Sequence, residues 1–218
     1  MRRTIGLGLI GLVCMAAAAS ADDLSPPPWD RSDPYAVTAH WEFNTPDMSL
    51  PPDGPLTNLT NGGGAQTLLT LLPMEPGMEP IYQEGAWYFP YFTSMDIVVD
   101  NVIDDYPVKH LQIQYTYVSG AFGAPGAYWI EAYDPTGEVT YVYVGTTEWQ
   151  IPGTNQWQHV ATYDLFPNPD YEVIHIDLYE GTLLSQVIVD TISVPEPATL
   201  ALVGLGVAGL VARRRRSK

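Results

Sequence analysis

Four aspartates and one asparagine lie close together near the middle of the chain and could bind a cation. They are Asp96, Asp100, Asn101, Asp104 and Asp105, between two predicted strands. Calcium takes about six to eight oxygen ligands in proteins, and the spacing here matches neither an EF-hand loop nor a nonapeptide repeat. The cluster therefore indicates either a calcium site or a solvated acidic turn, and no other cofactor is expected.

A second group combines aromatic rings with carboxylates on a predicted hairpin. If Tyr133 pairs with Glu138 across the turn Asp134–Gly137, one face of the hairpin carries Trp129, Glu131, Tyr133 and Glu138. The opposite face then carries Tyr141 and Tyr143 towards the core. Rings beside carboxylates suit a sugar, because ring faces stack on its C–H groups while acids bond its hydroxyls. The alternative is that the rings only stiffen cross-strand pairs.

Little in the sequence indicates catalysis. The four histidines are scattered, and no HExxH, GxSxG or glycine-rich phosphate loop is present. Glu131 and Glu138 could in principle serve a glycosidase, but two acids across a hairpin are ordinary in so acidic a chain. We therefore expect a protein that is not an enzyme.

The charge of the chain is divided unevenly between its ends and its middle. Of 9 basic and 25 acidic residues, only Arg31 and Lys109 are basic between Asp22 and Val194, where 24 acids lie, so this region carries a formal charge of −22. Such a surface repels phosphates and anionic lipids. Binding of nucleic acid by the middle region is thus excluded.

The elements that must position these residues are predicted to be short strands. Apolar and polar residues alternate at 36–43 and 110–118, and further strands are expected at 87–99, 128–133, 138–144, 157–165, 172–179 and 186–194. In 110–118 the odd-numbered residues from Leu111 to Tyr117 should face inward. Proline and glycine turns separate these segments, and no long helical period occurs between them. The pattern predicts an all-β fold, a single jelly-roll-like β-sandwich over 36–194, after an extended proline-rich lead at 22–35.

The amino terminus has the pattern of a secretory signal peptide. A basic start is followed by an apolar stretch from Ile5 to Ala19 and by the small residues Ala19 and Ala21. Signal peptidase is expected to cut after Ala21. The single cysteine, Cys14, lies within this segment, so the mature chain is expected to have no disulfide.

The carboxyl terminus combines three features in order: Pro195-Glu196-Pro197, an apolar run at 198–212, and four arginines at 213–216. As a helix the run would span roughly 22 Å, less than the ~30 Å hydrocarbon core, so it predicts a short transmembrane helix. The arginines place the end of the tail in the cytoplasm. A plain membrane anchor is the alternative interpretation.

This tail resembles the PEP-CTERM sorting signal of exosortase substrates. The resemblance implies processing by an exosortase-type membrane enzyme, passage through an inner-membrane intermediate, and delivery to the cell surface or the exopolysaccharide matrix. A looser likeness joins the middle region to uncharacterised exported PEP-CTERM proteins of planctomycete type. It depends on Pro27-Pro28-Trp29, the stretch Lys109–Tyr117, and Pro167–Glu172.

Together these patterns predict an exported surface or matrix protein with a signal peptide at 1–21, the sandwich at 36–194 and the sorting signal at 195–218. A carbohydrate-binding module is the alternative, and a glycan-active enzyme is a third hypothesis. The expected partners are signal peptidase, the sorting enzyme and exopolysaccharide.

Overall fold

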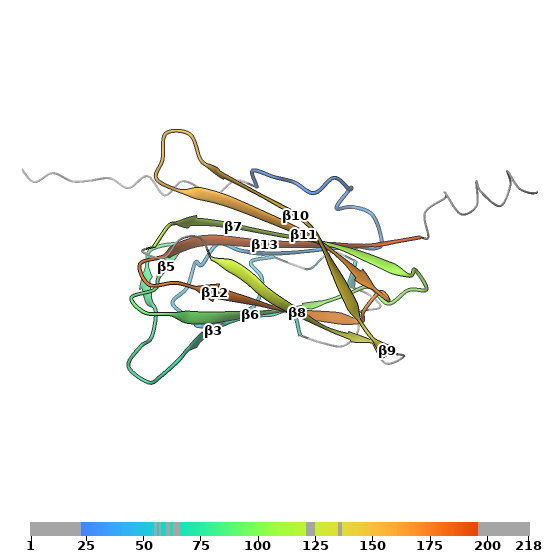
Figure 1. Cartoon of the computed structure of the whole chain (residues 1–218), viewed down its shortest axis with the longest axis horizontal. Coiled ribbons are helices and arrows are strands. Elements are labelled where there is room, and N and C mark those ends of the chain that lie inside the picture. Colours follow the sequence, from blue (N-terminus) through green and yellow to red (C-terminus); the bar gives the residue numbers. More distant parts are fainter. Residues whose placement is uncertain are drawn as a thin grey trace, which may run out of the picture.

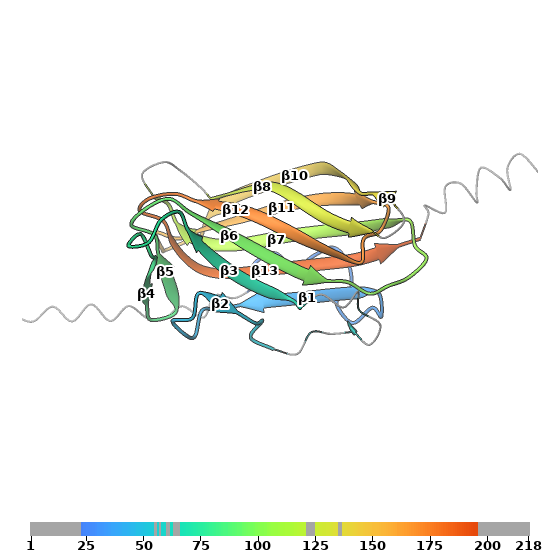
Figure 2. The same ribbon diagram turned by 90° about the horizontal axis from the view of Figure 1, so that it is seen from below.

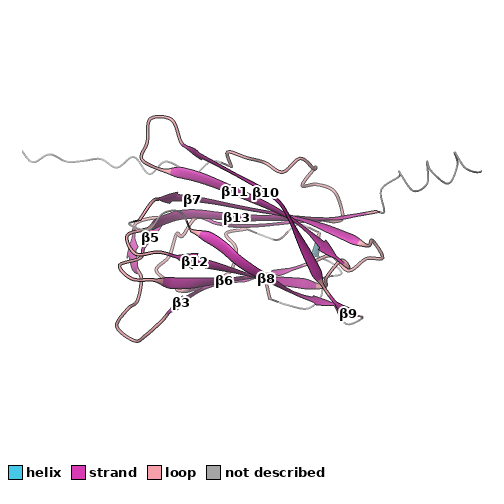
Figure 3. Ribbon diagram, viewed as in Figure 1, coloured by secondary structure: helices cyan, strands magenta, loops and turns pink. Residues whose placement is uncertain are grey.

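The fold consists of two antiparallel β-sheets packed face to face (Figure 1). This computed structural model describes residues 23–195 except 55, 57, 60, 61, 63–65, 121–124, 135 and 136, and only the backbone of 126–129, 137 and 138. The signal peptide with Ala19 and Ala21, Glu196, Pro197 and the apolar run lie outside these residues. Among the described residues there is no α-helix (Figure 3), so the predicted all-β class is confirmed there.

One sheet has seven strands in the order β10-β11-β7-β13-β5-β4, with β1 also pairing with β13. Its strands are β1 (Ala36–Trp41), β4 (Ile81–Gln83), β5 (Ala86–Tyr88), β7 (Val108–Val118), β10 (Thr140–Gln150), β11 (Trp157–Phe166) and β13 (Leu183–Val194). The long strands β7 and β13 lie in the middle of this sheet, side by side, although they are far apart in sequence (Figure 1).

The other sheet has six strands in the order β2-β3-β6-β12-β8-β9. Its strands are β2 (Ser49–Leu50), β3 (Leu68–Pro73), β6 (Thr93–Asp100), β8 (Gly126–Asp134), β9 (Gly137–Glu138) and β12 (Tyr171–Leu178). Successive strands often cross between the sheets, so that β6, β7 and β8 alternate between them (Figure 2).

Alternating side chains build the core between the sheets, because neighbouring residues of a strand point to opposite faces. On β7 the inward row predicted from the sequence is observed: Leu111, Ile113, Tyr115 and Tyr117 are buried in the core. Ile174 and Ile176 of β12 face them from the other sheet. At one end of the sandwich, however, the inward positions of both sheets are polar, and these positions form the site described below.

Two strand predictions were wrong, both at points where the chain changes sheet. The segment 87–99 was expected to be one broken strand, but β5 belongs to the seven-stranded sheet and β6 to the other, with Pro90 between them. The segment 138–144 was expected to return beside 128–133 throughout. Only the two residues of β9 do so, and β10 then joins the far edge of the other sheet. Tyr141 and Tyr143 are consequently exposed, by 42% and 53%, instead of lying in the core.

Candidate functional site

The predicted sugar-binding residues lie on β8 and β9 of the six-stranded sheet. Tyr133 pairs with Glu138 in the expected register, while the side chains of Trp129 and Glu138 lie outside the described residues. Tyr133 is 49% exposed and stacks on Tyr171 of β12, with ring centroids 5.2 Å apart and planes 18° apart. Together with Glu131 these two rings line a hollow of about 180 Å³. Sequence patterns did not indicate Tyr171 as a binding residue, because only the register between β12 and β8 brings it beside Tyr133.

The four predicted calcium ligands point in different directions. Asp96 lies on the outer face of the six-stranded sheet, where its carboxylate is 2.7 Å from Nδ1 of His175. Asp100 is buried and Asp105 is exposed. Asp104 accepts hydrogen bonds from the Tyr106 backbone N–H and from Asn168 Nδ2, at 2.7 and 2.9 Å. Within the described part of the chain, no group of three or more His, Cys, Asp or Glu side chains is arranged to hold a metal ion.

Each of the four histidines has a carboxylate within ion-pair distance. His110, His159 and His175 lie directly opposite Asp164, Glu148 and Asp96 on neighbouring strands, and His40 lies 3.7 Å from Glu42. The three cross-strand distances are 2.6, 3.2 and 2.7 Å. Strand register creates these pairs, which is why the scattered sequence positions did not indicate them.

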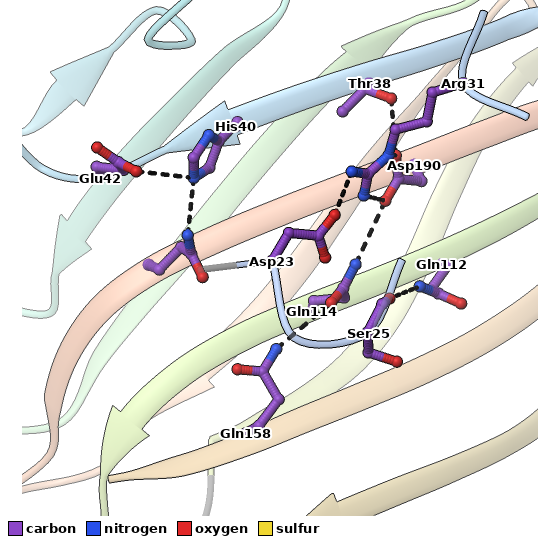
Figure 4. A network of polar contacts seen from close by, with 11 residues as sticks. Asp23, Ser25, Arg31, Thr38, His40, Glu42, Gln112, Gln114, Gln158 and Asp190 are labelled. Atoms are coloured by element: carbon purple, nitrogen blue, oxygen red, sulfur yellow. Dashed lines mark hydrogen bonds and ion pairs between the residues drawn. The ribbon is translucent and has the colours of Figure 1, made fainter. Parts of the chain in front are cut away.

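The proline-rich lead lies across the outer face of the seven-stranded sheet and is held there by Arg31 (Figure 4). The Arg31 guanidinium donates two hydrogen bonds of 2.6 Å to the buried carboxylate of Asp190, and a further one to Asp23. Thr38 also donates to Asp190, at 2.7 Å, and Gln112 donates to the Ser25 carbonyl, at 2.8 Å. Bidentate pairing of this kind is strong and directional. The lead is therefore attached to the sheet by charge-assisted bonds.

The same arginine shows how the protein stabilises a cation at its surface. Burial lowers the pKa of Arg31, but hydrogen bonds and attraction from Asp190 and Asp23 outweigh this effect, and the pKa is raised overall. The guanidinium borders an open hollow of about 390 Å³ that is also lined by Thr38, His40 and Glu42.

The other cation of the domain, Lys109, is buried and is not hydrogen-bonded to a described carboxylate, in contrast to Arg31. Lys109 lies on β7 with a fully buried side chain, directed between the sheets in the same inward row as Leu111. Within the described part of the chain, its Nζ has no hydrogen-bond partner. Glu172 of β12 and Asn101, just after β6, are buried to the same degree. We call Asn101, Lys109 and Glu172 the buried triad.

Hydrogen bonds fix two members of the triad. Asn101 Nδ2 donates to Glu172 Oε2 and, at 3.2 Å, to the Pro169 carbonyl. Thr191 of β13 donates to Asn101 Oδ1 at 3.1 Å. Glu172 Oε1, like Lys109 Nζ, has no hydrogen-bond partner among the residues that the structure describes. Unsatisfied buried polar atoms are rare in native proteins and call for an explanation.

Burial also changes the acid–base properties of the triad. It lowers the pKa of Lys109 to about 8, although attraction by Glu172 acts in the other direction. Burial likewise raises the pKa of Glu172 to about 7, against the effects of Lys109 and of the Asn101 hydrogen bond. Near neutral pH a proton can therefore pass between the Lys109 amine and the Glu172 carboxyl group. The ordinary pKa values of lysine and glutamate lie too far apart to allow this exchange.

Comparison with known proteins assigns the end of the chain and leaves the middle unassigned. Residues 193–216 match the PEP-CTERM protein-sorting motif. The comparisons with curated proteins and with solved structures found no match to the chain. The predicted sorting signal is thus confirmed, and the likeness of the middle region to planctomycete-type proteins receives no support.

The motif implies that the protein is exported, passes through a membrane-anchored intermediate and is processed by an exosortase-type enzyme. Among the described residues, no helix is long and apolar enough to cross a membrane. The predicted transmembrane run at 198–212 lies outside them.

Proposed function

We propose that the folded domain is a non-enzymatic component of the cell surface or extracellular matrix, carried on a jelly-roll-like sandwich and released there by loss of its tail. The sorting motif at 193–216 is the observation that supports this function. The tail serves as an address, and removing it leaves the acidic domain as the part that acts at the destination.

The motif follows the folded domain without a linker. Strand β13 ends at Val194, which is still paired with Val108, and Pro195 follows directly in an exposed position. An enzyme that recognises Pro195-Glu196-Pro197 must therefore work close to the folded domain.

Replacing Pro195, Glu196 and Pro197 together by alanine tests this proposal in cells that contain the sorting enzyme. We expect the wild-type surface form to lack Arg213–Lys218 by intact mass, and the triple variant to keep this tail and remain in the inner membrane. A wild-type surface protein with its tail intact would show that the segment is a simple anchor.

Carbohydrate binding is a second candidate function, supported by the hollow between Glu131, Tyr133 and Tyr171. An exposed ring beside a carboxylate offers both a stacking face and a hydrogen-bond acceptor to a neutral sugar. The anionic surface favours neutral glycans over anionic ones, since like charges repel.

The test is binding of the mature protein to a neutral exopolysaccharide fraction and to a glycan array. Tyr133→Ala and Tyr171→Ala should each weaken retention about tenfold, the loss of one aromatic stacking contact at ~1.4 kcal/mol. Tyr141→Ala removes a comparably exposed tyrosine of β10 and should leave binding unchanged. Equal retention of all four proteins would exclude this hollow as the binding site.

A further inference from the structure

We propose that Lys109 and Asn101 join in an intramolecular isopeptide bond between the two sheets, with Glu172 as the group that transfers the protons. The protein would then carry a covalent cross-link that requires no cysteine. This inference is independent of the function proposed above.

Strand register brings the amine side chain towards the asparagine. Lys109 is opposite Ser193 on β13, and the next inward position of β7, Leu111, is opposite Thr191. Lys109 and Thr191 are thus diagonal neighbours on the inner face of the seven-stranded sheet. Because the Thr191 hydroxyl is bonded to Asn101 Oδ1, the Asn101 carboxamide is held at β13, the strand next to the one that carries Lys109.

The carboxamide is bonded in a way that suits attack on its carbon. Thr191 donates to Oδ1, which draws electrons from Cγ, and Glu172 accepts a hydrogen bond from Nδ2, the atom that would leave. Both contacts are buried, so water does not compete for the carbon. Glu172 attracts the Lys109 amine electrostatically, and the same carboxylate accepts the hydrogen bond from the Asn101 carboxamide.

The two protonation states needed for the reaction are accessible. A lysine desolvated in a protein interior readily loses its proton and becomes a nucleophile. The carboxylate of Glu172 takes this proton, and its raised pKa makes it a competent acid at neutral pH.

The reaction balances without a further reagent. The neutral Lys109 Nζ attacks Asn101 Cγ, and a tetrahedral intermediate forms. Glu172 carries a proton from Nζ to Nδ2, the Cγ–Nδ2 bond breaks, and ammonia leaves. The product is a secondary amide between Nζ and Cγ, with Glu172 back in its starting state.

The bond would also change the surroundings of Glu172. The new amide N–H can donate to the Glu172 carboxylate and so takes the place of the Asn101 Nδ2 donor, which leaves as ammonia. A buried ammonium is replaced by a neutral amide, so the cost of burying its charge disappears.

Intact mass of the wild-type protein, purified in its exported form and denatured, decides the question. We expect a mass lower than that of the corresponding sequence by one ammonia, and a branched peptide that contains both Lys109 and Asn101 after proteolysis. Ammonia loss without that peptide, or the full sequence mass in protein that is folded by circular dichroism, would overturn the proposal.

Variants separate the reactants from their surroundings. Lys109→Met and Asn101→Ala remove one reactant each, and Glu172→Gln keeps both reactants but removes the group that carries the proton. All three variants should have the full mass of their sequences, without the loss of ammonia. Asn168→Ala is the matched control: it removes a neighbouring asparagine that contacts Asp104 and Ser193 and should still form the bond. Loss of the bond in Asn168→Ala together with a persisting ammonia loss in Lys109→Met would contradict the assignment.

Discussion

The only two basic residues between Asp22 and Val194 are held in opposite ways. Arg31 lies on the outside of the seven-stranded sheet, partly exposed, and its donors meet the carboxylates of Asp190 and Asp23. Lys109 lies inside the sandwich, and no described residue forms a hydrogen bond with its Nζ. In a region with 24 acids, partners for a cation are abundant, so an unpartnered lysine is a specific feature of the fold rather than a shortage of anions.

The chemical difference between the two side chains fits their positions. A guanidinium keeps its charge in any environment and binds a carboxylate with two parallel donors, so Arg31 suits a permanent clamp. An ammonium can lose its proton when it is desolvated, which makes Lys109 able to react. The domain thus uses one cation to attach a segment and the other to place a nucleophile.

Removing the inner cation should have the largest effect. Lys109→Met removes the cross-link between the sheets and leaves Glu172 buried without the amide N–H as a donor, and we expect a loss of about 3–5 kcal/mol in the free energy of unfolding at pH 8. The loss should be smaller at pH 6, because Glu172 can then become neutral by binding a proton. Urea denaturation at the two pH values measures both.

The double variant Lys109→Met/Glu172→Leu controls for loss of packing. It also removes the buried carboxylate and should recover the part of the loss that comes from leaving this carboxylate unsatisfied, since apolar side chains replace buried charged groups at little cost. If the double variant is less stable than Lys109→Met, the charge of Glu172 is not the source of the effect.

The dependence of stability on pH distinguishes a free Lys109 from a bonded one. The folded pKa of a free Lys109, about 8, lies below the ordinary value of 10.5. The free energy of unfolding is therefore highest above pH 10.5, where the lysine is neutral in both states. It falls as the pH decreases towards 8, because the unfolded chain then binds a proton that the folded protein does not. In Asn101→Ala, where no bond can form, unfolding free energy should rise between pH 8 and 10 by an amount on the order of 2 kcal/mol.

The wild-type protein should lack this rise, because an amide nitrogen does not titrate. Glu172 has a raised pKa in both proteins, so both should lose stability as the pH rises from about 4.5 to 7. Parallel curves for wild type and Asn101→Ala between pH 8 and 10 would show that Lys109 is free in the wild type.

The sequence predicted the parts of this comparison that depend on local pattern. Alternation placed Leu111 to Tyr117 correctly, and the charge count singled out Arg31 and Lys109 as the only internal cations. Periodicity does not, however, show which strands become neighbours. The contacts of Lys109 with the surroundings of Glu172 and Thr191 come from β12 and β13, more than 60 residues further along the chain. Asn101 was considered only as a calcium ligand, because its hydrogen bond to Glu172 depends on the packing of the chain after β6 against β12.

The same limit explains the errors at β10. The alternation of tyrosine and valine at 141–144 predicted that Tyr141 and Tyr143 face the core. Alternation shows only that they share one face of the strand, and this face is buried only where a second sheet covers it. The chain leaves β9 and places this segment at the edge of the seven-stranded sheet, where both faces are exposed.

Removing the outer cation should have a moderate effect. Arg31→Met leaves Asp190 buried, but Thr38 and Gln114 still donate to its carboxylate. We therefore expect a loss of about 1–3 kcal/mol, the cost of leaving part of a buried charge unsatisfied. Faster cleavage within the lead by a protease should accompany it, since Arg31 attaches this segment. A variant as unstable as Lys109→Met would show that the two cations do not differ as proposed.

The smallest loss of stability is expected when Arg31 is replaced by a residue that keeps the positive charge but not the planar guanidinium. Arg31→Lys retains one positive charge near Asp190 and Asp23, but an ammonium cannot present the two parallel donors that now meet Asp190. We expect a loss of about 1 kcal/mol, smaller than in Arg31→Met, because attraction to two carboxylates persists. Urea denaturation of both variants at low and high salt separates the contributions: the advantage of lysine over methionine should shrink in high salt, since screening weakens an exposed pair. If Arg31→Lys is as unstable as Arg31→Met at low salt, geometry alone holds the lead, and the charge of Arg31 contributes nothing to its attachment.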